Sequence, residues 1–525
     1  MLSGDWVPRD THQIDYHKLP RVPGKHAVIS DVRDRDGAWV HQHAYLAHHG
    51  GRYWAMWSDG PGVRKAGTLV GGHRNLVPGH DRAGTRVSFA TSLDGVSWSE
   101  PGDLSGAPWK DGFGWIARGF WVRGEELLAL ATHFHAPGYA GPGLSLEAFR
   151  WDASMNRWAA KGTVRDDSMN NFPPKKLPSG EWMMTRRDHR RQVSVMIGGV
   201  SAFDDWRIKP MASYDGKGRP EEPYWYVLPD GRNVLGLIRD NGGSKFLLRT
   251  LSSDNGRTWS RIHRTNFPDA TSKFYVHRTS RGYYVMASNS NPRKRDPMTL
   301  AVSADGVTFD RLFWLVGNRH IDYPHIIEHD GRLLIAFSGA KQTMEVMSVK
   351  LNDLEALAMP GSVALEKPAP GIVQSTKTAN HWIDLGDEGA TLNIAFEMTV
   401  PDRGNEALLR LATASGANRV AMGVDSEGHL VAEVFKARTR GEALPVGRTV
   451  LVRARIRSRT SQPDELIVRV ESKKRDGVEG NPSDEWVLAN REGRSDANLS
   501  RSIFSGEGSI RGLRITSDLG QIRDK

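Results

Sequence analysis

Six apolar β-rich runs, each entered through a glycine turn, recur along the first two thirds of the chain and limit its fold more than any other feature. The glycines of consecutive runs are 73, 56, 51, 51 and 49 residues apart. A period near fifty residues without a helical pattern predicts the blades of a β-propeller. The long first interval contains an insertion rich in Gly, His and Arg at residues 61–84. The runs begin at Gly51, Gly124, Gly180, Gly231, Gly282 and Gly331.

A second motif interleaves with these runs. Residues 252–259, SSDNGRTW, fit the pattern S-x-D-x-G-x-T-W, which resembles the Asp-box of sialidase-like propellers. Residues 92–98 and 303–309 are versions that are one residue shorter. In such a turn the Asp accepts hydrogen bonds from backbone amides, the Gly takes a conformation that other residues resist, and the aromatic residue packs between sheets. We therefore interpret the boxes as structural and assign them no catalytic role.

The repeat predicts an all-β fold that begins with a propeller at residues 1–368, which we take as the catalytic domain. Six units can be counted directly, and the ends of this region, residues 1–36 and 344–372, have the length for a seventh. We predict seven blades, with six as the alternative. In either case we expect N-terminal residues to pair with the last sheet and close the ring.

The pattern changes after the Pro-Ala-Pro-Gly segment at residues 368–371. From residue 373 to 525 the chain consists of alternating strands with polar turns between them, which predicts a β-sandwich of the concanavalin or laminin-G type. No aromatic platform or metal cluster stands out in this region. We therefore expect an accessory domain that buttresses the propeller.

Composition narrows the functional classes. The hydrophobic content is 38% and the mean hydropathy is −0.49, and no run approaches the ~20 apolar residues of a membrane helix. The chain has no cysteine, which excludes disulfides and thiolate chemistry and leaves His, Asp and Glu as metal ligands. We expect no required cofactor, and the sequence leaves a structural Ca²⁺ or Zn²⁺ open. The N-terminal residues lack the apolar core of a signal peptide, yet we expect a secreted or periplasmic location, with a cytoplasmic one as the alternative.

The net charge of +10, from 71 basic against 61 acidic residues, favours an anionic partner. No nucleic-acid-binding motif and no basic amphipathic helix accompanies this charge. We therefore expect an acidic polysaccharide or oligosaccharide as the partner, and neither nucleic acid nor a membrane. The oligomeric state is left open.

Propellers bind ligands where loops and innermost strands of several blades converge. One segment of this kind, residues 320–341, opens with a polar cluster of His320, Asp322, Tyr323 and His325 directly before a predicted hairpin. Polar residues outside the hairpins and boxes are the other candidates. The catalytic candidates are His43, Tyr323, His73 and His80, and the substrate-binding candidates are Arg118, Asn171, Arg187, Glu222, Arg239, Lys273, Asn289, Arg295, His320 and Asp322.

Arginine recurs in successive blades among these candidates. A guanidinium donates two parallel hydrogen bonds to a carboxylate, so convergent arginines suit a uronate or ulosonate sugar. Ion pairs with blade carboxylates are the competing interpretation, and we expect them for about half of the arginines because such pairs are common.

Four segments carry a resemblance to a known group: NNFPPKKLPSGEWMMTRRDH, FPDATSKF, SNSNPRKRDPMTLAVSADG and RHIDYPHIIEHDGRLLIAFSG. They resemble the seven-bladed propellers that include α-L-rhamnosidases and L-rhamnose-α-1,4-D-glucuronate lyases, which act on arabinogalactan and gum arabic. Ulvan lyases are more distant relatives of similar architecture. The resemblance covers residues 30–360 and implies a carbohydrate-active enzyme.

The main prediction is a polysaccharide lyase that cleaves a bond to a uronic acid by β-elimination. Arg118, Arg187 and Arg239 would hold the carboxylate, while His43 with Tyr323, or His73 or His80, would move the protons. No convincing pair of carboxylic acids emerges from the candidates, which favours elimination.

Two alternatives remain. The first is a glycoside hydrolase, either sialidase-like with Tyr323 and Glu222 as its nucleophile pair, or an α-L-rhamnosidase with a single inward His. The second is a non-catalytic propeller that only binds glycans.

Overall fold

The computed structural model divides into two compact units, the larger of which contains the propeller and the other the C-terminal strands. The predicted domain boundary at residues 368–373 lies outside the described residues. None of the described helices is both long and apolar enough to cross a membrane. The structure describes residues 1–2, 7–8, 10–35, 39–62, 69–70, 73–74, 81–138, 141–211, 218–358, 380–381, 390–399, 409–413, 418–425, 427, 429–434, 437–443, 449–457, 465–472, 485–489, 499–503 and 510–519.

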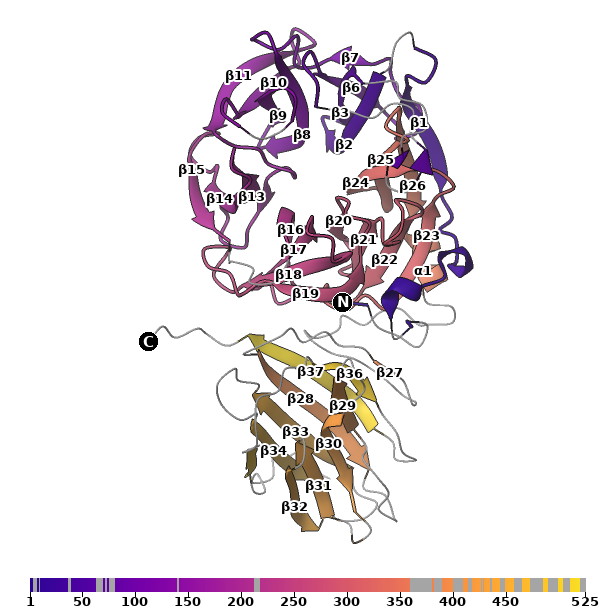
Figure 1. The fold of residues 1–525 in the computed structure, drawn as a ribbon, viewed down its shortest axis with the longest axis vertical. Helices are drawn as coiled ribbons and strands as arrows, with labels where there is room; N and C mark the ends of the chain where they lie inside the picture. The colour runs from indigo at the N-terminus through magenta and orange to yellow at the C-terminus, as the bar shows by residue number, and fades with distance from the viewer. Residues whose placement is uncertain are drawn as a thin grey trace. The chain divides into compact units, whose positions relative to one another are not determined.

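The described residues of the propeller form six four-stranded antiparallel sheets, which Figure 1 shows arranged as a ring. In each blade the innermost strand precedes the second and third strands in the chain. From blade 1 to blade 6 these inner strands are β2 (Trp39–His49), β8 (Phe113–Arg123), β12 (Lys175–Lys176), β16 (Pro220–Val227), β20 (Tyr275–Arg278) and β24 (Ile321–His329).

The remaining strands follow outward in order within each blade. Blade 1 has β3 (Arg52–Pro61), β6 (Arg86–Ser92) and β7 (Gly102–Asp103), and blade 2 has β9 (Glu126–His135), β10 (Ser145–Asp152) and β11 (Arg157–Asp166). Blade 3 has β13 (Trp182–Arg187), β14 (Val193–Gly198) and β15 (Trp206–Pro210), and blade 4 has β17 (Val234–Asp240), β18 (Phe246–Ser252) and β19 (His263–Pro268). Blade 5 has β21 (Tyr284–Ser288), β22 (Met298–Ser303) and β23 (Arg311–Val316), and blade 6 has β25 (Arg332–Gly339), β26 (Thr343–Lys350) and β1 (Lys25–Asp31). Outside the blades lie the short strands β4 (Leu69–Val70) and β5 (His73–Arg74), the helix α1 (Leu351–Ala358) and two 3₁₀ turns, η1 (Thr11–Gln13) and η2 (Tyr16–Lys18).

The prediction of seven blades was wrong, and the alternative of six is confirmed. Strand β1 from the N-terminus pairs with β26, with Lys25 opposite Ser348 and Asp31 opposite Thr343. Both ends of the propeller region are therefore used in a single blade. The predicted closure of the ring by N-terminal residues is confirmed by the same pairing.

The glycines of the repeat lie where the sequence placed them. Each sits in the turn between the innermost strand of a blade and its second strand, and all six have φ between 61° and 95°. The Asp-box turns follow the third strand of blades 1, 4 and 5. Asp254 accepts hydrogen bonds from the amides of Arg257 at 3.1 Å and Thr258 at 2.9 Å, and the Trp259 side chain packs between blades 3 and 4. The structural interpretation of these boxes is confirmed.

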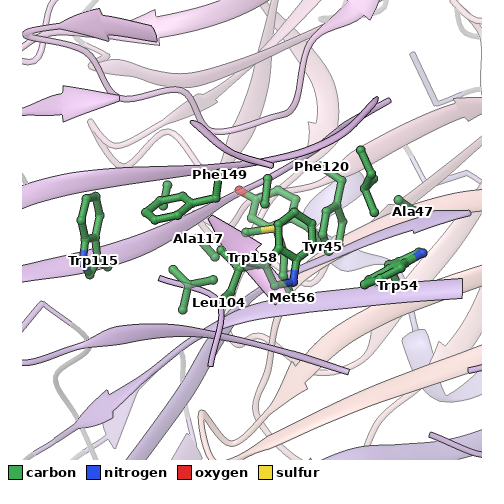
Figure 2. Close-up of a cluster of buried hydrophobic side chains, with 14 residues drawn as sticks. Tyr45, Ala47, Trp54, Met56, Leu104, Trp115, Ala117, Phe120, Phe149 and Trp158 are labelled. Carbon is green, nitrogen blue, oxygen red and sulfur yellow. The ribbon is translucent and has the colours of Figure 1, made fainter. Parts of the chain in front are cut away.

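Aromatic clusters between neighbouring blades form the core. Figure 2 shows the cluster between blades 1 and 2, where Trp54 from β3 meets Trp158 from β11 at a ring separation of 5.8 Å. Phe149 of β10 and Trp115 of β8 extend the same cluster, with their rings 5.5 Å apart. Full burial of a large apolar side chain contributes about 1.5–3 kcal/mol, so each interface of this size stabilises the ring substantially.

In the C-terminal unit, the described strands form two antiparallel sheets. Their orders are β27-β36-β29-β30-β31-β32 and β35-β34-β33-β28-β37. A sandwich of the concanavalin or laminin-G type, and its buttressing role, stay predictions. The strands are β27 (Asn380–His381), β28 (Ala390–Thr399), β29 (Leu409–Thr413), β30 (Asn418–Val424), β31 (His429–Val434), β32 (Ala437–Ala443), β33 (Thr449–Arg457), β34 (Glu465–Ser472), β35 (Glu485–Ala489), β36 (Leu499–Ile503) and β37 (Ile510–Leu519).

The core arrangement predicts how two tryptophans differ in their effect on stability. Trp54 is 3% exposed within the aromatic cluster, whereas Trp109 is 54% exposed. Trp54→Ala should destabilise the propeller by about 3–5 kcal/mol, because truncation leaves a cavity among rigid rings. Trp109→Ala is the matched control and should cost less than about 1 kcal/mol. Thermal and urea unfolding of the two variants would measure this difference, and equal losses would contradict the assignment of the core.

Candidate functional site

Four inner strands contain a register irregularity at the same level of the propeller. In blades 1, 2, 4 and 6 the strand pairing shifts within residues 42–45, 117–119, 221–224 and 322–325. At three of these places a residue other than glycine takes the left-handed conformation: His43 at φ 61°, Glu222 at φ 53° and Tyr323 at φ 52°. Such strain is costly and is concentrated at functional sites, where a bulge redirects a side chain.

Two of these bulge residues meet at the seam between blades 1 and 6. The rings of His43 and Tyr323 stack with their centroids 5.3 Å apart, and both residues are more than nine-tenths buried. The Nδ1 atom of His43 lies 3.1 Å from the hydroxyl of Ser58, which itself accepts a hydrogen bond from the amide of Ala117 at 2.9 Å. The Ser58 hydroxyl can therefore donate its own proton to Nδ1 of His43, which favours the tautomer with the imidazole proton on Nε2.

Three arginines each form an ion pair with a carboxylate on an inner strand. Arg187 donates to Glu221 at 2.9 Å, and Arg239 donates to Glu222 at 2.6 Å. Arg295 donates to Asp322, which also lies 2.7 Å from Nε2 of His320. Within the described part of the chain, the buried Nε–H of each of the three guanidinium groups has no hydrogen-bond partner.

These pairs decide the protonation states at the axis. Burial alone would raise the pKa of Glu222, but Arg239, Lys273 and Arg187 hold it at about 2. The pKa of Asp322 also lies well below its usual value, because Arg295 and His320 outweigh its burial. Both carboxylates are therefore ionised at neutral pH and can accept protons or hydrogen bonds but cannot donate protons.

Two further groups near these arginines have pKa values shifted toward neutrality. Burial lowers the pKa of Lys273 to about 7, although Glu222 acts in the opposite direction. Burial raises the pKa of Asp269 to about 7, against the opposing effect of Arg239 and Arg295. Groups that titrate near pH 7 are suited to proton transfer.

The remaining predicted residues lie in the same region. Arg118 donates to the side-chain oxygen of Asn171 at 3.2 Å and contacts the sulfur of Met169. The ammonium of Lys273 lies 5.3 Å from the centre of the Tyr323 ring. Asn289 is fully buried, and neither its amide nitrogen nor its amide oxygen has a hydrogen-bond partner. Unsatisfied buried amide atoms of this kind are rare without a ligand or water.

The structure brings most of the sequence candidates together. Members of the group come from every blade and contact one another as described above, although their catalytic and binding roles stay predictions. The side chain of His73 and all of His80 lie outside the described residues. The group comprises His43, Arg118, Asn171, Arg187, Glu222, Arg239, Lys273, Asn289, Arg295, His320, Asp322 and Tyr323.

Comparison with known proteins identifies the family. Residues 63–335, more than half of the chain, match the model of the BNR repeat-like domain. The chain belongs to the BNR repeat-like family. No curated protein matches it in sequence.

Solved structures with this fold include sialidases. A mutant of Trypanosoma rangeli sialidase that displays trans-sialidase activity is 11% identical and has a TM-score of 0.61, with 95% of this chain and 94% of that chain covered. The same sialidase in complex with the inhibitor DANA gives 11% identity and a TM-score of 0.60, with 95% of each chain covered. A Dyadobacter fermentans protein of unknown function is 14% identical with a TM-score of 0.50, and the match covers 63% of this chain and 100% of that one.

These likenesses show that this BNR repeat-like protein has a sialidase-like fold. The Asp-boxes of the sequence had indicated the same architecture. The predicted membership of the rhamnosidase and glucuronate lyase group is not confirmed, and its seven blades do not fit the six found here. In the described part of the chain, no group of three or more His, Asp or Glu side chains is arranged to hold a metal ion.

Tyr45, Tyr224 and Asp269 were missed by sequence reasoning, whereas His325 was noted in the polar cluster of the segment 320–341 but given no role. Tyr45, Tyr224 and His325 each follow a bulge residue by two positions, and Asp269 lies in a loop of blade 5. The signal was present in three short strings, His-Ala-Tyr at 43–45, Glu-Pro-Tyr at 222–224 and Tyr-Pro-His at 323–325. Aligning these strings by blade would have identified both the bulge and the residue beneath it.

The Glu222 and Arg239 pair predicts a specific acid response. The pKa of Glu222 is lower in the folded protein than in the unfolded chain, so its contribution to stability is complete above about pH 4.5 and is lost as the pH falls toward 2. Glu222→Gln should lower stability at neutral pH by about 3 kcal/mol or more, because Arg239 stays buried without its partner. The variant should also lose less stability than the parent between pH 4.5 and 2.

Thermal unfolding across this pH range would measure both effects. Glu125→Gln is the matched control, since Glu125 is exposed and its loss should change neither value. An acid response of Glu222→Gln identical to that of the parent protein would contradict the assignment.

Proposed function

We propose that this protein is a glycoside hydrolase that cleaves the bond to a sugar carrying a carboxylate, with Tyr323 as the nucleophile. The placement of Tyr323 carries this proposal. A strained bulge holds the residue at the axis, and the cations of Arg295 and Lys273 lie 5.4 and 5.3 Å from the centre of its ring. The BNR repeat-like family and the sialidase-like fold support a saccharide substrate, since a sialidase of this fold was solved in complex with sialic acid.

Arg239 and Arg295 are the groups we assign to the substrate carboxylate. Each uses one terminal nitrogen on a protein carboxylate and keeps its Nε–H without a partner. Both are electrostatically coupled to Tyr323. A carboxylate that accepts from these two groups would fix the neighbouring anomeric carbon beside the phenol, which is the positioning that catalysis requires.

A phenol is a suitable nucleophile for such a substrate. An ionised carboxylate would be repelled by the carboxylate of the sugar, whereas the phenol is neutral until it reacts. Glu222 is ionised and shares the Arg239 environment with Tyr323, so we assign it the role of the base that receives the phenolic proton. Asp269, with its pKa of about 7, is the acid we assign to the leaving group.

Removal of the phenolic oxygen tests the nucleophile. Tyr323→Phe should lower kcat/KM on an aryl glycoside of sialic or glucuronic acid by on the order of 10³-fold, because the variant lacks the oxygen that we assign to the covalent intermediate. Tyr226→Phe is the matched control, since the hydroxyl of Tyr226 donates only to the carbonyl of Gly306 at 2.6 Å outside the site. Equal activities of the two variants would exclude Tyr323 as the nucleophile.

A second candidate function is β-elimination at a uronic acid, which the stacking of His43 on Tyr323 favours. In this reaction Arg118, Arg187 or Arg239 neutralises the uronate and so acidifies the proton on C5. One member of the His43 and Tyr323 pair removes that proton, the C4–O4 bond breaks, and the other member protonates O4. A carbon–carbon double bond remains in the product.

The products distinguish these reactions. Arabinogalactan, ulvan and sialylated oligosaccharides would be incubated with the protein and assayed for reducing sugar and for the ultraviolet absorbance of an unsaturated uronate. Hydrolysis gives sugar without absorbance, elimination gives both, and retention on a glycan column without product indicates a binding propeller. His43→Ala should abolish elimination but reduce hydrolysis far less, because only elimination requires its proton transfer. A secreted or periplasmic location and the acidic character of the saccharide stay predictions.

A further inference from the structure

Beneath the bulge residues, aromatic rings from five blades form a chain of ring contacts, which we call the collar. It runs from Tyr45 through His325, Tyr275 and Tyr224 to Phe172, and the centroids of rings in contact lie 4.3–6.0 Å apart. In blades 1, 4 and 6 the ring follows the bulge residue by two positions, which is about 7 Å further along the strand. The collar consists of Tyr45, Phe172, Tyr224, Tyr275 and His325.

Two lysines place their ammonium groups against this collar. The Nζ of Lys175 lies 4.4 Å from the ring centre of Tyr224 and donates to the hydroxyl of the same tyrosine. The Nζ of Lys273 lies 4.8 Å from the ring centre of Tyr45 and donates to its hydroxyl at 2.8 Å. The hydroxyl of Tyr224 donates a hydrogen bond to the backbone carbonyl of Val276, and the hydroxyl of Tyr45 donates one to the backbone carbonyl of Asn171. Each ammonium therefore makes one hydrogen bond with its three N–H groups.

His325 adds a third donor. The amide of Leu46 donates to Nδ1 of this imidazole at 3.2 Å, so Nδ1 carries no proton. The proton of the neutral ring must then be on Nε2. Nε2 is buried and has no hydrogen-bond partner among the residues that the structure describes, and His325 is only 2% exposed.

Both lysines act electrostatically on His325. The pKa of His325 lies well below its usual value, first because of burial and then because of Lys175, Lys273 and His277. His277 has a carboxylate partner, Glu328, at 3.2 Å. Among the described residues, neither collar lysine forms an ion pair. Glu222 partly compensates the charge of Lys273, whereas burial is the only cause of the pKa shift of Lys175. A buried donor without an acceptor and a buried cation with incomplete compensation are both costly.

We propose that a small inorganic anion, such as a halide, binds within the collar and is held by the ammonium groups of Lys175 and Lys273 and by Nε2–H of His325. The chemistry of the donors selects the ligand. All three groups donate and none accepts, so a species that only accepts hydrogen bonds fits better than water or a hydroxyl. Because Lys273 and His325 are each 2% exposed, the collar favours a small ion over an organic acid.

The collar also links anion binding to pH. Burial lowers the pKa of both Lys175 and Lys273 to about 7. An adjacent anion favours the protonated amines, so affinity should increase as the pH falls below 7 and decrease above it. The groups that face Lys273 are Glu222, Arg118, Arg239 and the Tyr45 and Tyr323 rings, and those that face Lys175 are Tyr224, Tyr275 and His325.

Thermal unfolding of the full chain in chloride or bromide tests the site. Sodium gluconate at the same ionic strength is the reference, because this anion is too large for the collar. The Tm of the parent protein should rise saturably with halide, more at pH 6 than at pH 8. Lys175→Met should abolish the rise, whereas Lys176→Met, which alters the neighbouring exposed lysine, should preserve it. A rise that is the same in gluconate, or that survives Lys175→Met, would overturn the proposal.

Bromide diffraction provides a second measurement that does not depend on the variants. Crystals grown in bromide should show an anomalous peak among Lys175, Lys273 and His325. Bromide bound only elsewhere, or absent from the collar at saturating concentration, would refute the site even if Lys175→Met fails to fold. Both measurements are independent of catalysis, so their outcome and that of the hydrolase proposal can be told apart.

Discussion

Buried charged side chains dominate the centre of this propeller, and the arrangement of the blades depends on the ion pairs that these side chains form with one another. The pair between Arg187 and Glu221 joins blades 3 and 4. The pair between Arg295 and Asp322 joins the loop between β21 and β22 of blade 5 to the inner strand of blade 6. The side chain of Gln42 in blade 1 donates to the same Asp322 at 3.2 Å. Removal of one partner would leave a buried charge, which typically costs 3–5 kcal/mol. The site is therefore also part of what fixes the blades in register.

The strained bulges allow an inner strand both to pack into the core and to place a polar side chain at the site. Before and after each bulge the inner strand pairs regularly with its neighbour and contributes apolar side chains to the core. At the bulge itself the chain gains an unpaired residue whose side chain leaves the alternation of the strand. Repetition of this device around the axis places His43, Glu222 and Tyr323 at one level, with the aromatic collar at the next.

Much of this architecture could be predicted from the sequence because its signals are local. Glycine turns, Asp-boxes and β-rich runs each depend on a few consecutive residues, and all were found in their predicted places. The number of blades depends on a long-range contact. Pairing of N-terminal residues with the last sheet was predicted, but no short pattern shows that residues 25–31 supply the fourth strand of blade 6 and not part of a seventh sheet.

The candidate site was predictable in composition but not in its contacts. The arginines were identified from their recurrence, yet which of them pair with carboxylates depends on neighbours from other blades. Arg187, Arg239 and Arg295 have such partners, whereas Arg118 bonds to the amide of Asn171, so pairing is more frequent than the expected half. The protonation states of Lys273 and Asp269 depend on burial by distant segments, which a linear pattern does not encode.

The shared final blade has a consequence for biosynthesis. Strand β1 emerges from the ribosome well before its partner β26, which is made only after more than three hundred further residues. At typical elongation rates of about 5–20 residues per second, the nascent N-terminus waits on the order of tens of seconds with an unsatisfied strand edge. Such an edge invites pairing with other chains. Closure of the ring therefore has to follow the synthesis of β26, and protection of the β1 edge until then would matter most.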